Sequence, residues 1–495
     1  MHKLKFFLKS KPIFFLLLPI FFVLHGFTEN FHAIPFSEAF VLLLLYFAAA
    51  LVIFFISWLF YRNWFKAAIL SFCLMAFHFF FGAIQDFLKK NFDDAFITRY
   101  SFLLGFFLVI FIILIIVLKK IRQPNPRASF FLNCLVLILL VIDSIWLITK
   151  FSSGNSAAFS VTGSKIDCDG CTKPDIYFLV FDEYASSLAL KEQWNYDNGD
   201  LDSFLAEKGF RILAGSKSNY NFTQFSIAST LNMEYLQLPD PAACTVKDYN
   251  HCAELIRDNV VCSMLRSAGY QILNHSLFDL HENPSPVHDD FLPLKTKLIT
   301  SQTFLSRVKK DLYYHLLAGK FEISWLSKDL IYSTYNNNQK TINATMQIAG
   351  DSSSAARFVY SHIEMPHPPF YYQGNNKEEN EQKLLAEQQL PTINSYLGYI
   401  PRTNLVIKEI VNKIIDQAKK PVVIILLGDH GFRTEQPQQF YFRNLNAVYL
   451  SSKNYSGFYD SITNVNEFRV LLNNLFNTKL TLARDSTVFL RDKKS

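Results

Sequence analysis

The chain has 495 residues, of which half are apolar and 50 are phenylalanine, and this length is enough for several domains. The apolar residues are concentrated before about residue 150. The formal net charge of +6 comes partly from lysines and arginines that flank these apolar segments, so the charge is no argument for nucleic acid and we expect no such partner.

Five long apolar runs come first in the chain. Each approaches or reaches the length that crosses a bilayer, and almost none carries charged residues at helical spacing, which argues against a soluble helical core. The runs cover residues 12–27, 39–60, 67–87, 102–118 and 130–148. We predict a five-helix transmembrane domain over residues 1–150. Its short first run resembles a signal-peptide core, but no small-residue cleavage site follows it.

Basic residues near the ends of the runs predict the orientation, because they favour the cytoplasmic side. They gather before the first run, after the second and after the fourth: Lys3, Lys5, Lys9, Lys11, Arg62, Lys66, Lys119, Lys120, Arg122 and Arg127. An odd number of spans then exports everything after Lys150. Asp143, inside the last run, is either a functional intramembrane acid or a residue near the interface.

A small polar linker, residues 151–172, follows the membrane part. Export of the remainder permits disulfides, and five cysteines fall on that side: Cys168, Cys171, Cys244, Cys252 and Cys262. For Cys168 and Cys171 we favour a local disulfide over a zinc or redox pair, because no second CxxC or histidine pair accompanies them.

Strand-like runs alternate with helical stretches over residues 173–495. We expect strands at 174–181, 210–214, 270–274, 358–362, 422–427 and 447–450, and helices at 201–208, 253–268 and 403–418. This alternation predicts an α/β domain with a parallel sheet and helices on both faces. Residues 284–351 lack the rhythm, and we predict an insertion there, near the site mouth, that shapes substrate choice.

Two of the apolar strands end abruptly in polar residues. PDIYFLVFDEYA presents Asp182 and Glu183, and PVVIILLGDHGF presents Asp429 and His430. The carboxyl ends of strands in open α/β sheets face the ligand crevice, so these groups can meet a metal or a substrate. An acid followed by an imidazole suits a divalent cation.

Two further segments carry chemistry. Thr223 enters a segment rich in small hydroxyl residues, where it is either an ordinary N-cap or a hydroxyl placed at a helix N-terminus to attack an anion. In FVYSHIEMPHPPFYY, prolines fix a turn that holds His367 at the end of a strand. There it can donate to a phosphoryl oxygen or protonate a leaving alkoxide. His362, within the strand, is either a hydrogen-bonded structural residue or a substrate contact.

These motifs resemble the alkaline phosphatase superfamily in its sulfatase-like branch. The match runs through FDEY, NFTQFS, HIEMPHPPF and GDHG, in the expected order across the whole exported domain. Five spans before such a domain look like the lipoteichoic acid synthases and the lipid A phosphoethanolamine transferases. The resemblance implies an alkaline phosphatase-like mixed, mainly parallel sheet. It also implies one divalent metal ion, Zn or Mn with Ca or Mg as alternatives, held by Asp182, Thr223, Asp429 and His430.

The sequence departs from these relatives in three places. Five-span relatives usually have Glu where Asp182 stands, so Glu183 is either a second ligand or a neighbour of the ligands. The Thr223 segment lacks the convertible residue, the Pro and the Arg of the C/S-x-P-x-R motif, so formylglycine chemistry is not expected. Arg433 is either a contact for an anionic substrate or a solvated side chain.

The resemblance implies a metal-dependent phosphotransferase in the bacterial inner (cytoplasmic) membrane, multi-pass, with its catalytic domain on the periplasmic or extracellular side. It would move a phospholipid headgroup, phosphoethanolamine or phosphoglycerol, through a phosphothreonine at Thr223 to a surface glycan or lipid, with His367 protonating the leaving group. Membrane lipids would be donor or anchor. One alternative is a sulfatase-like hydrolase of phosphate or sulfate esters. A second is a non-enzymatic membrane protein that retains the fold.

Overall fold

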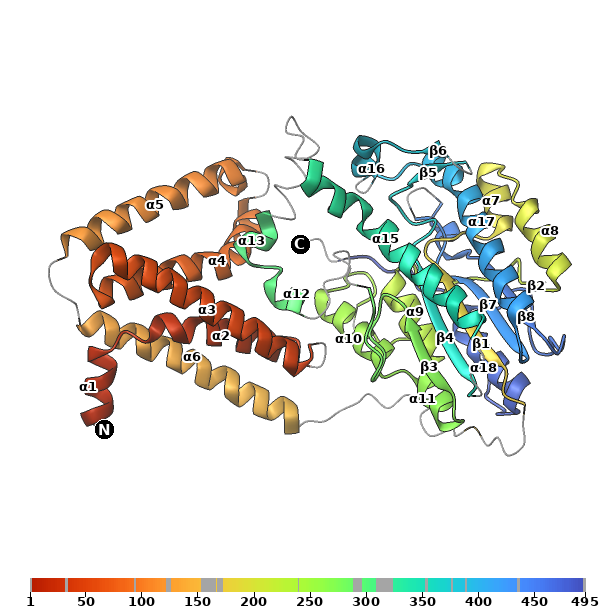
Figure 1. The fold of residues 1–495 in the computed structure, drawn as a ribbon, viewed down its shortest axis with the longest axis horizontal. Coiled ribbons are helices and arrows are strands. Elements are labelled where there is room, and N and C mark those ends of the chain that lie inside the picture. The colour runs from red at the N-terminus through yellow and green to blue at the C-terminus, as the bar shows by residue number, and fades with distance from the viewer. Residues whose placement is uncertain are drawn as a thin grey trace. The chain divides into compact units, whose positions relative to one another are not determined.

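A computed structural model gives the fold of the chain (Figure 1). It describes residues 2–31, 34–92, 95–121, 126–152, 166, 172–238, 240–287, 296–308, 324–351, 355–374, 377–387, 390–433 and 437–492. The predicted disulfide between Cys168 and Cys171 lies outside these ranges. The cysteines within them are free thiols: Cys73, Cys134, Cys244, Cys252 and Cys262.

The chain divides into two compact units. Residues 1–156 with 291–316 form the helical unit, and residues 157–290 with 317–494 form the α/β unit. The predicted boundaries of the transmembrane domain, the linker and the catalytic domain remain predictions. In the structure, residues 284–351, predicted as one insertion, are shared between the two units.

The helical unit is built from long apolar helices. Its elements are α1 (His2–Ser10), α2 (Phe14–Glu29), α3 (Phe36–Tyr61), α4 (Trp64–Phe92), α5 (Tyr100–Lys120), α6 (Pro126–Ser152) and the short helices α12 (Thr296–Thr300) and α13 (Phe304–Arg307). The five predicted apolar runs correspond to α2 through α6. In the described part of the chain, α3 to α6 are long and apolar enough to cross a membrane, whereas α2 has 16 residues.

Ring contacts show how α2 packs despite its shorter length. Phe15 stacks on Phe54 with centroids 4.4 Å apart, and Phe22 meets Tyr46 edge-on at 5.9 Å. Residue numbers rise along α2 while they fall along α3, so the two helices are antiparallel. The short helix is therefore a full member of the bundle.

Polar contacts give the direction of α6 relative to α2. His25 Nδ1 lies 3.1 Å from Asp143 Oδ1, and Lys150 Nζ donates to Thr28 O at 2.5 Å. Numbers rise together along both helices, so α2 and α6 are parallel. This is the arrangement that an odd number of antiparallel segments produces, and it gives Asp143 a partner from another helix.

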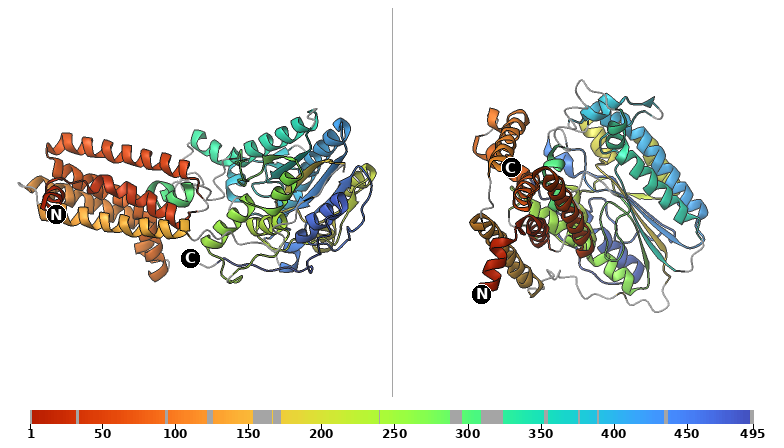
Figure 2. Two further views of the ribbon diagram at one scale, coloured as in Figure 1. Left: turned by 90° about the horizontal axis from the view of Figure 1, so that it is seen from below. Right: turned by 60° about the vertical axis from the view of Figure 1, so that its left-hand side comes forward.

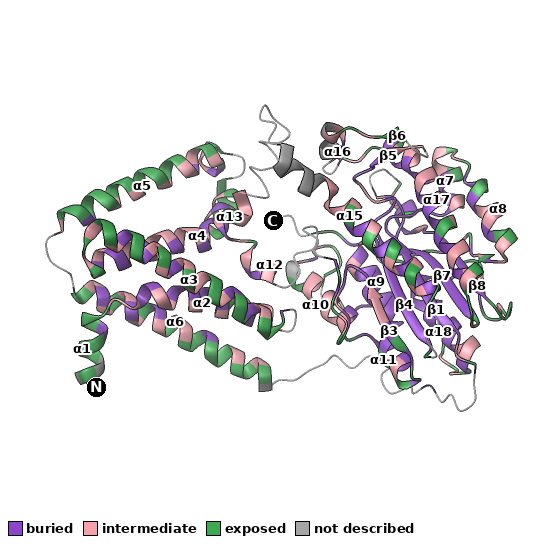
Figure 3. Cartoon of the chain, viewed as in Figure 1, coloured by how far each residue is buried: buried purple, intermediate pink, exposed green. Residues whose placement is uncertain are grey.

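The outer surface of the helical unit is apolar. Helix α5 is mostly exposed in Figure 3, although its sequence is almost entirely hydrophobic, and Leu108, Ile112 and Ile116 are each about half exposed or more. An apolar helix that leaves its side chains uncovered within the protein is typical of a surface that faces lipid.

The α/β unit is built on one six-stranded sheet. The strands are β1 (Asp175–Phe181), β2 (Arg211–Ile212), β3 (Gln271–His275), β4 (Arg357–Ile363), β7 (Val422–Gly428) and β8 (Asn446–Leu450), in the order β2-β8-β7-β1-β4-β3. The four strands β7, β1, β4 and β3 are parallel to one another. Strand β8 is antiparallel to both of its neighbours, β7 and β2. This confirms the predicted mixed, mainly parallel sheet. A separate pair joins β5 (Tyr372–Gln373) to β6 (Lys377–Glu378).

Helices cover both faces of this sheet, as Figures 1 and 2 show. The helices of this unit are α7 (Ser187–Trp194), α8 (Gly199–Lys208), α9 (Thr223–Asn232), α10 (Val246–Arg257), α11 (Val260–Ser267), α15 (Ser324–Ala349), α16 (Glu381–Glu387), α17 (Ile393–Gln417) and α18 (Asn464–Phe476), of which α16 lies near β5 and β6 and not on the sheet. Every residue of β1, β4 and β7 is buried, and alternate side chains of β1 face opposite helical layers. Leu179 belongs to the core beneath α17, whereas Phe178 meets Phe468 of α18.

The prediction of one continuous helix is wrong at one place in the chain. The expected helix at 253–268 is two helices, α10 and α11. The break occurs because Asn259 caps the second helix, with its side-chain oxygen accepting from Cys262 N at 2.8 Å.

Candidate metal centre

The central strands deliver polar residues to one edge of the sheet. Phe181 of β1 is in register with Gly428 of β7 and with Ile363 of β4. The next residues along β1 and β7 are Asp182 and Asp429. Because the three strands are parallel, both carboxylates emerge at the same carboxyl edge.

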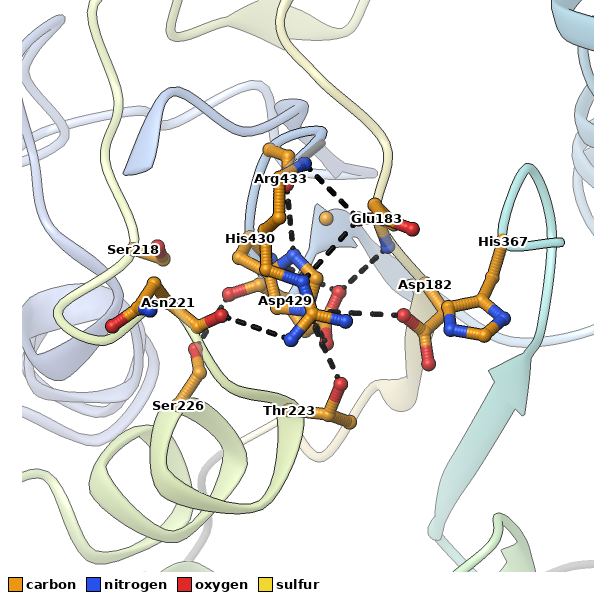
Figure 4. Close-up of polar contacts among 12 residues, drawn as sticks. Asp182, Glu183, Ser218, Asn221, Thr223, Ser226, His367, Asp429, His430 and Arg433 are labelled. Carbon is orange, nitrogen blue, oxygen red and sulfur yellow. Dashed lines mark hydrogen bonds and ion pairs between the residues drawn. The ribbon is translucent and has the colours of Figure 1, made fainter. Parts of the chain in front are cut away.

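Asp182, Asp429 and His430 form a buried group (Figure 4). One ligand atom from each lies within 4.8 Å of the others. His430 Nε2 is 3.2 Å from Asp429 Oδ2 and 3.9 Å from Asp182 Oδ1. The structure thus brings together three of the four predicted metal ligands.

Thr223, the fourth predicted ligand, lies against this group. It is the first residue of α9, it is buried, and its Oγ1 lies 3.2 Å from His430 Nε2. Ser226, one turn further along α9, donates its hydroxyl to Asp429 O at 2.6 Å. The hydroxyl of Ser226 therefore fixes the start of α9 against the loop that carries Asp429 and His430.

The electrostatics of the group follow from burial and mutual proximity. Burial raises the pKa of Asp182, but the neighbouring imidazoles, His367 foremost, outweigh it and hold that pKa below its ordinary value. Burial and the charge of Asp182 raise the pKa of Asp429 to about 6. Burial, with Arg433 nearby, lowers the pKa of His430 to about 4, so its imidazole is neutral at pH 7 and able to act as a ligand.

The donor set fits a divalent cation. Among the described residues, Asp182 Oδ1 and Asp429 Oδ2 are buried side-chain oxygens without a hydrogen-bond partner. Two such carboxylate oxygens close together are unfavourable unless a cation lies between them. With the His430 nitrogen and the Thr223 hydroxyl they make three oxygens and one nitrogen, which suits Zn as well as Mn.

Glu183 is turned away from this group. Its backbone adopts a left-handed conformation with φ 64°, and its N–H donates to Asp429 Oδ1 at 2.9 Å. Its carboxylate instead accepts from the Arg433 backbone N–H at 3.1 Å and from Arg433 Nε at 3.3 Å. In the structure the Glu183 carboxylate is thus paired with Arg433, while its backbone supports Asp429.

Arg433 is a bound side chain, not a solvated one. Besides its pair with Glu183, its Nη1 donates to Asn221 O at 3.1 Å, and its guanidinium lies over the Phe222 ring at 5.5 Å. Asn221 and Phe222 are the two residues that directly precede Thr223. Arg433 thus brings positive charge to the start of α9, close to Thr223.

The two histidines of the β4 segment take different positions. His362 is fully buried, with Nδ1 3.2 Å from Tyr360 Oη and Nε2 3.3 Å from Asp182 Oδ2. Both ring nitrogens thus face protein groups, and one of them contacts Asp182. His367 is part-buried beside Asp182, and its Nδ1 lies 2.8 Å from Pro368 O.

The glycines of GDHG are explained by close backbone contacts. A Cβ atom on Gly428 would lie 2.4 Å from Tyr184 O, and one on Gly431 would lie 2.4 Å from Phe440 O. Any larger residue would displace the Asp429–His430 loop from the sheet edge.

Sequence reasoning missed Asn444. Its Nδ2 donates to Gly428 O, immediately before Asp429, and to Asn464 Oδ1 at 3.0 Å. An asparagine between a polar turn and a strand gives no signal of this kind, because the partner is distant in sequence and is defined only by the pairing of β7 with β8.

Comparison with known proteins adds a family assignment. Residues 257–469 match the sulfatase family model, a range that includes β4, β7 and the Asp429–His430 pair. This stretch of the chain is therefore a sulfatase-like domain. The matched range begins after Asp182 and Thr223, so the roles of these two residues rest on the geometry above. No curated protein matches the chain.

Solved structures of low identity resemble the sulfatase-like domain. The C-terminal periplasmic domain of EcEptC from Escherichia coli, in complex with Zn, is 9% identical, with 62% of this chain and 83% of that chain covered and a TM-score of 0.38. The periplasmic domain of the phosphoethanolamine transferase EptC from Campylobacter jejuni is 13% identical (64% and 99% covered, TM-score 0.37). The phosphonate monoester hydrolase of Agrobacterium radiobacter is 11% identical (61% and 74% covered, TM-score 0.38). TM-scores below 0.5 carry no conclusion about the reaction.

Proposed function

We propose that this chain is a membrane-bound phosphotransferase. It moves a phospholipid headgroup, phosphoethanolamine or phosphoglycerol, to a surface glycan or lipid through a phosphothreonine at Thr223. The enzyme is multi-pass and lies in the bacterial inner membrane, with the α/β unit on the periplasmic or extracellular side.

The position of the Thr223 hydroxyl carries the proposal. It is buried at the first residue of α9 and next to His430, in a group with two carboxylates that each leave one oxygen without a hydrogen-bond partner. A helix N-terminus attracts an anion, and Arg433 adds a guanidinium close by. A hydroxyl in this position is placed to attack the phosphorus of a bound phosphodiester.

The transfer needs two displacements at phosphorus. In the first, Thr223 Oγ1 forms a bond to phosphorus and releases its proton to water, and the bond to the diacylglycerol oxygen breaks. His367, which follows β4, gives that oxygen a proton. In the second, an acceptor hydroxyl passes its proton to His367 and forms a bond to the same phosphorus, the bond from phosphorus to Thr223 Oγ1 breaks, and Oγ1 takes a proton from water.

A divalent metal ion would be held by Asp182, Thr223, Asp429 and His430, with Zn or Mn as the expected metal. When bound, it would lower the pKa of the threonine hydroxyl and stabilise charge on the phosphoryl oxygens. The protein contributes the rigid placement of these groups, since Ser226, Glu183 and His362 each hold a ligand residue through a hydrogen bond.

The helical unit supports a lipid as the donor. Four helices long and apolar enough to cross a membrane exceed what anchoring requires, because one span suffices for that. A lipid donor and a membrane-bound enzyme share a surface, which raises their effective concentration.

The test is a search for the covalent intermediate. The purified full chain is incubated with bacterial phospholipids and Zn or Mn, and its peptides are mapped by mass spectrometry. We expect a phosphoethanolamine or phosphoglycerol adduct on Thr223 in the wild type, none in Thr223→Ala, and a reduced amount in the hydroxyl-retaining control Thr223→Ser.

Three other outcomes would contradict the transferase proposal. Metal-dependent consumption of lipid without an adduct or a modified acceptor would favour the hydrolase of phosphate or sulfate esters. Bound metal with no turnover of any common phospholipid would exclude these lipids as donors, and a chain that binds no metal would favour the non-enzymatic alternative.

A further inference from the structure

One segment that lies within the sequence of the α/β unit belongs by its packing to the helical unit. It contains α12 and α13, and we call Thr296–Val308 the cap segment. Both helices lie beside the long apolar helices in Figures 1 and 2. The insertion predicted at residues 284–351 includes this segment, but the sequence contains no sign of its contact with the long helices.

The cap segment makes two contacts that require glycine on the long helices. Ile299 is 4% exposed, and a Cβ atom on Gly26 of α2 would lie 2.7 Å from its side chain. The Gly82 N–H of α4 donates to Gln302 O at 2.8 Å, and a Cβ atom on Gly82 would lie 2.6 Å from that same oxygen. The backbone of the cap segment therefore touches the backbone of α4, a closeness that only glycine permits.

Aromatic and charged contacts continue the same surface. The Phe304 ring lies 4.9 Å from Phe77 and 5.1 Å from Phe81. Arg307 Nη2 is paired with Asp86 Oδ2 at 2.6 Å. By contrast Leu305, next to Phe304, is 65% exposed, so the contact has a defined face.

These contacts lie at the end of the bundle where α6 finishes. Gly26 is near the end of α2, and α2 and α6 run in the same direction, with Lys150 bonded to Thr28. The chain leaves for the α/β unit after Ser152, at this same end. The cap segment thus packs at the same end of the bundle as the end of α6.

The connection before the cap segment is short. Residues 288–295 separate Val287 from Thr296, and a chain of this length spans at most about 30 Å. Val287 follows β3, which is parallel to β4 and ends at the carboxyl edge that carries Asp182 and Asp429. The chain itself therefore limits how far this edge can move from a docked cap segment.

We propose that the cap segment is a docking element that makes the enzyme select donors embedded in a membrane. The eight residues before it tie the end of the β3 segment to a segment fixed on the apolar helices, so that lipid donors are favoured over soluble phosphodiesters. This inference rests on the proposed function, and it adds a determinant of specificity that lies outside the metal centre.

The docking is tested first by cross-linking in membranes. Gly26→Cys with Ile299→Cys is introduced into the full chain after Cys73→Ser and Cys134→Ser, and mild oxidation is followed by peptide mapping. We expect a disulfide, since the two Cβ positions lie 3.2 Å apart. The matched control, Gly105→Cys with Ile299→Cys, is expected to stay reduced, because an added Cβ at Gly105 meets nothing within 4 Å. Equal yields from the two pairs would overturn the proposal.

Specificity is tested by displacing the cap segment. Gly82→Leu places a side chain where Gln302 lies, and Gly105→Leu is the control on a free helix surface. Turnover of phosphatidylethanolamine and phosphatidylglycerol in vesicles is compared with turnover of bis(p-nitrophenyl) phosphate. For Gly82→Leu we expect the lipid KM to rise about tenfold or more with the soluble diester unaffected, because only the lipid reaction depends on restricted reach. Equal loss on both substrates, or none on either, would contradict the proposal.

A charge exchange between Asp86 and Arg307 tests the docking independently, in case Gly82→Leu does not fold. Asp86→Arg alone should raise the lipid KM, and Asp86→Arg with Arg307→Asp should restore it, since the pair at 2.6 Å is rebuilt with reversed signs. A double variant no better than the single would count against docking through this pair. If the wild type turns over the soluble diester but neither lipid, the proposed function fails, while the cross-linking result still decides whether the segment docks.

Discussion

Apolar side chains are exposed in one unit of this protein and buried in the other. In the helical unit, Ile112 and its neighbours on α5 are exposed along a helix that carries almost no polar residue. In the α/β unit, every side chain of β1, β4 and β7 is buried between helical layers. The difference shows which solvent each unit is built for: lipid covers the first, whereas the second must cover its own apolar surface against water.

Polar side chains differ between the units in the same sense. The helical unit has few, and pairs such as His25 with Asp143 join two helices. The α/β unit concentrates them at one edge of its sheet, where the metal-binding group leaves two carboxylate oxygens without partners.

The largest expected effect comes from removing a ligand. Asp429→Ala should lower turnover by roughly 10³-fold or more and reduce bound metal, measured by elemental analysis of the purified chain. The fold should persist, because Asp429 is at the sheet edge and not in the core. Asp182→Ala and Thr223→Ala should behave alike in turnover. Near-normal activity in any of the three would show that the group is not the active site.

The contrast in solvent is tested by a pair of truncations. Leu426→Ala in β7 should destabilise the α/β unit by about 2–5 kcal/mol, since it empties a fully buried site. Ile112→Ala on α5 should change stability by well under about 1 kcal/mol in a membrane mimic. Thermal unfolding in detergent, followed by intrinsic fluorescence, measures both. Equal costs would mean that α5 packs against protein.

A buried acid gives a pH dependence to the α/β unit. Glu467 of α18 is fully buried, and burial raises its pKa from 4.5 to about 7. Between these values the folded state keeps a proton that the unfolded state releases. The contribution of this proton to the free energy of unfolding is therefore fully present below pH 4.5. It is lost as the pH rises to about 7, which lowers the free energy of unfolding by roughly 3 kcal/mol at most.

Glu467→Gln should remove this pH dependence, because the amide does not titrate. The melting temperatures of the full-length variant and wild type are measured from about pH 5 to about pH 8 and compared. A wild-type slope that survives in Glu467→Gln would assign the proton to another group.

The smallest expected effect concerns Asn444, which supports the metal-binding loop through Gly428 O. Asn444→Ala should cost about 1–3 kcal/mol by leaving that carbonyl without its buried partner. It should also weaken metal affinity, measured by competition with a chelating dye, while leaving the donor set intact. Unchanged metal affinity would reduce Asn444 to a purely structural role.

Much of the fold follows from local pattern. The strand positions were predictable because buried parallel strands are short, continuous apolar runs, and the helices of the helical unit because apolar runs of their length have few alternatives. The edge position of Asp182, Asp429 and His430 followed as well, since parallel strands end together. The split of α10 from α11 was missed, because an N-cap at Asn259 overrides a continuous helical periodicity.

What the sequence determined by itself was the chemistry available: two carboxylates, an imidazole and a hydroxyl, placed at the ends of strands and the start of a helix. Only the tertiary structure decided which of the adjacent acids faces the metal-binding group. Asp182 continues the strand toward His430, whereas Glu183 turns through a positive φ and pairs with Arg433, a residue 250 positions away. The docking of the cap segment on Gly82 was decided in the same way. Local pattern records the preference of a segment for helix or strand, but the direction of a side chain at the end of an element depends on partners that only folding brings near.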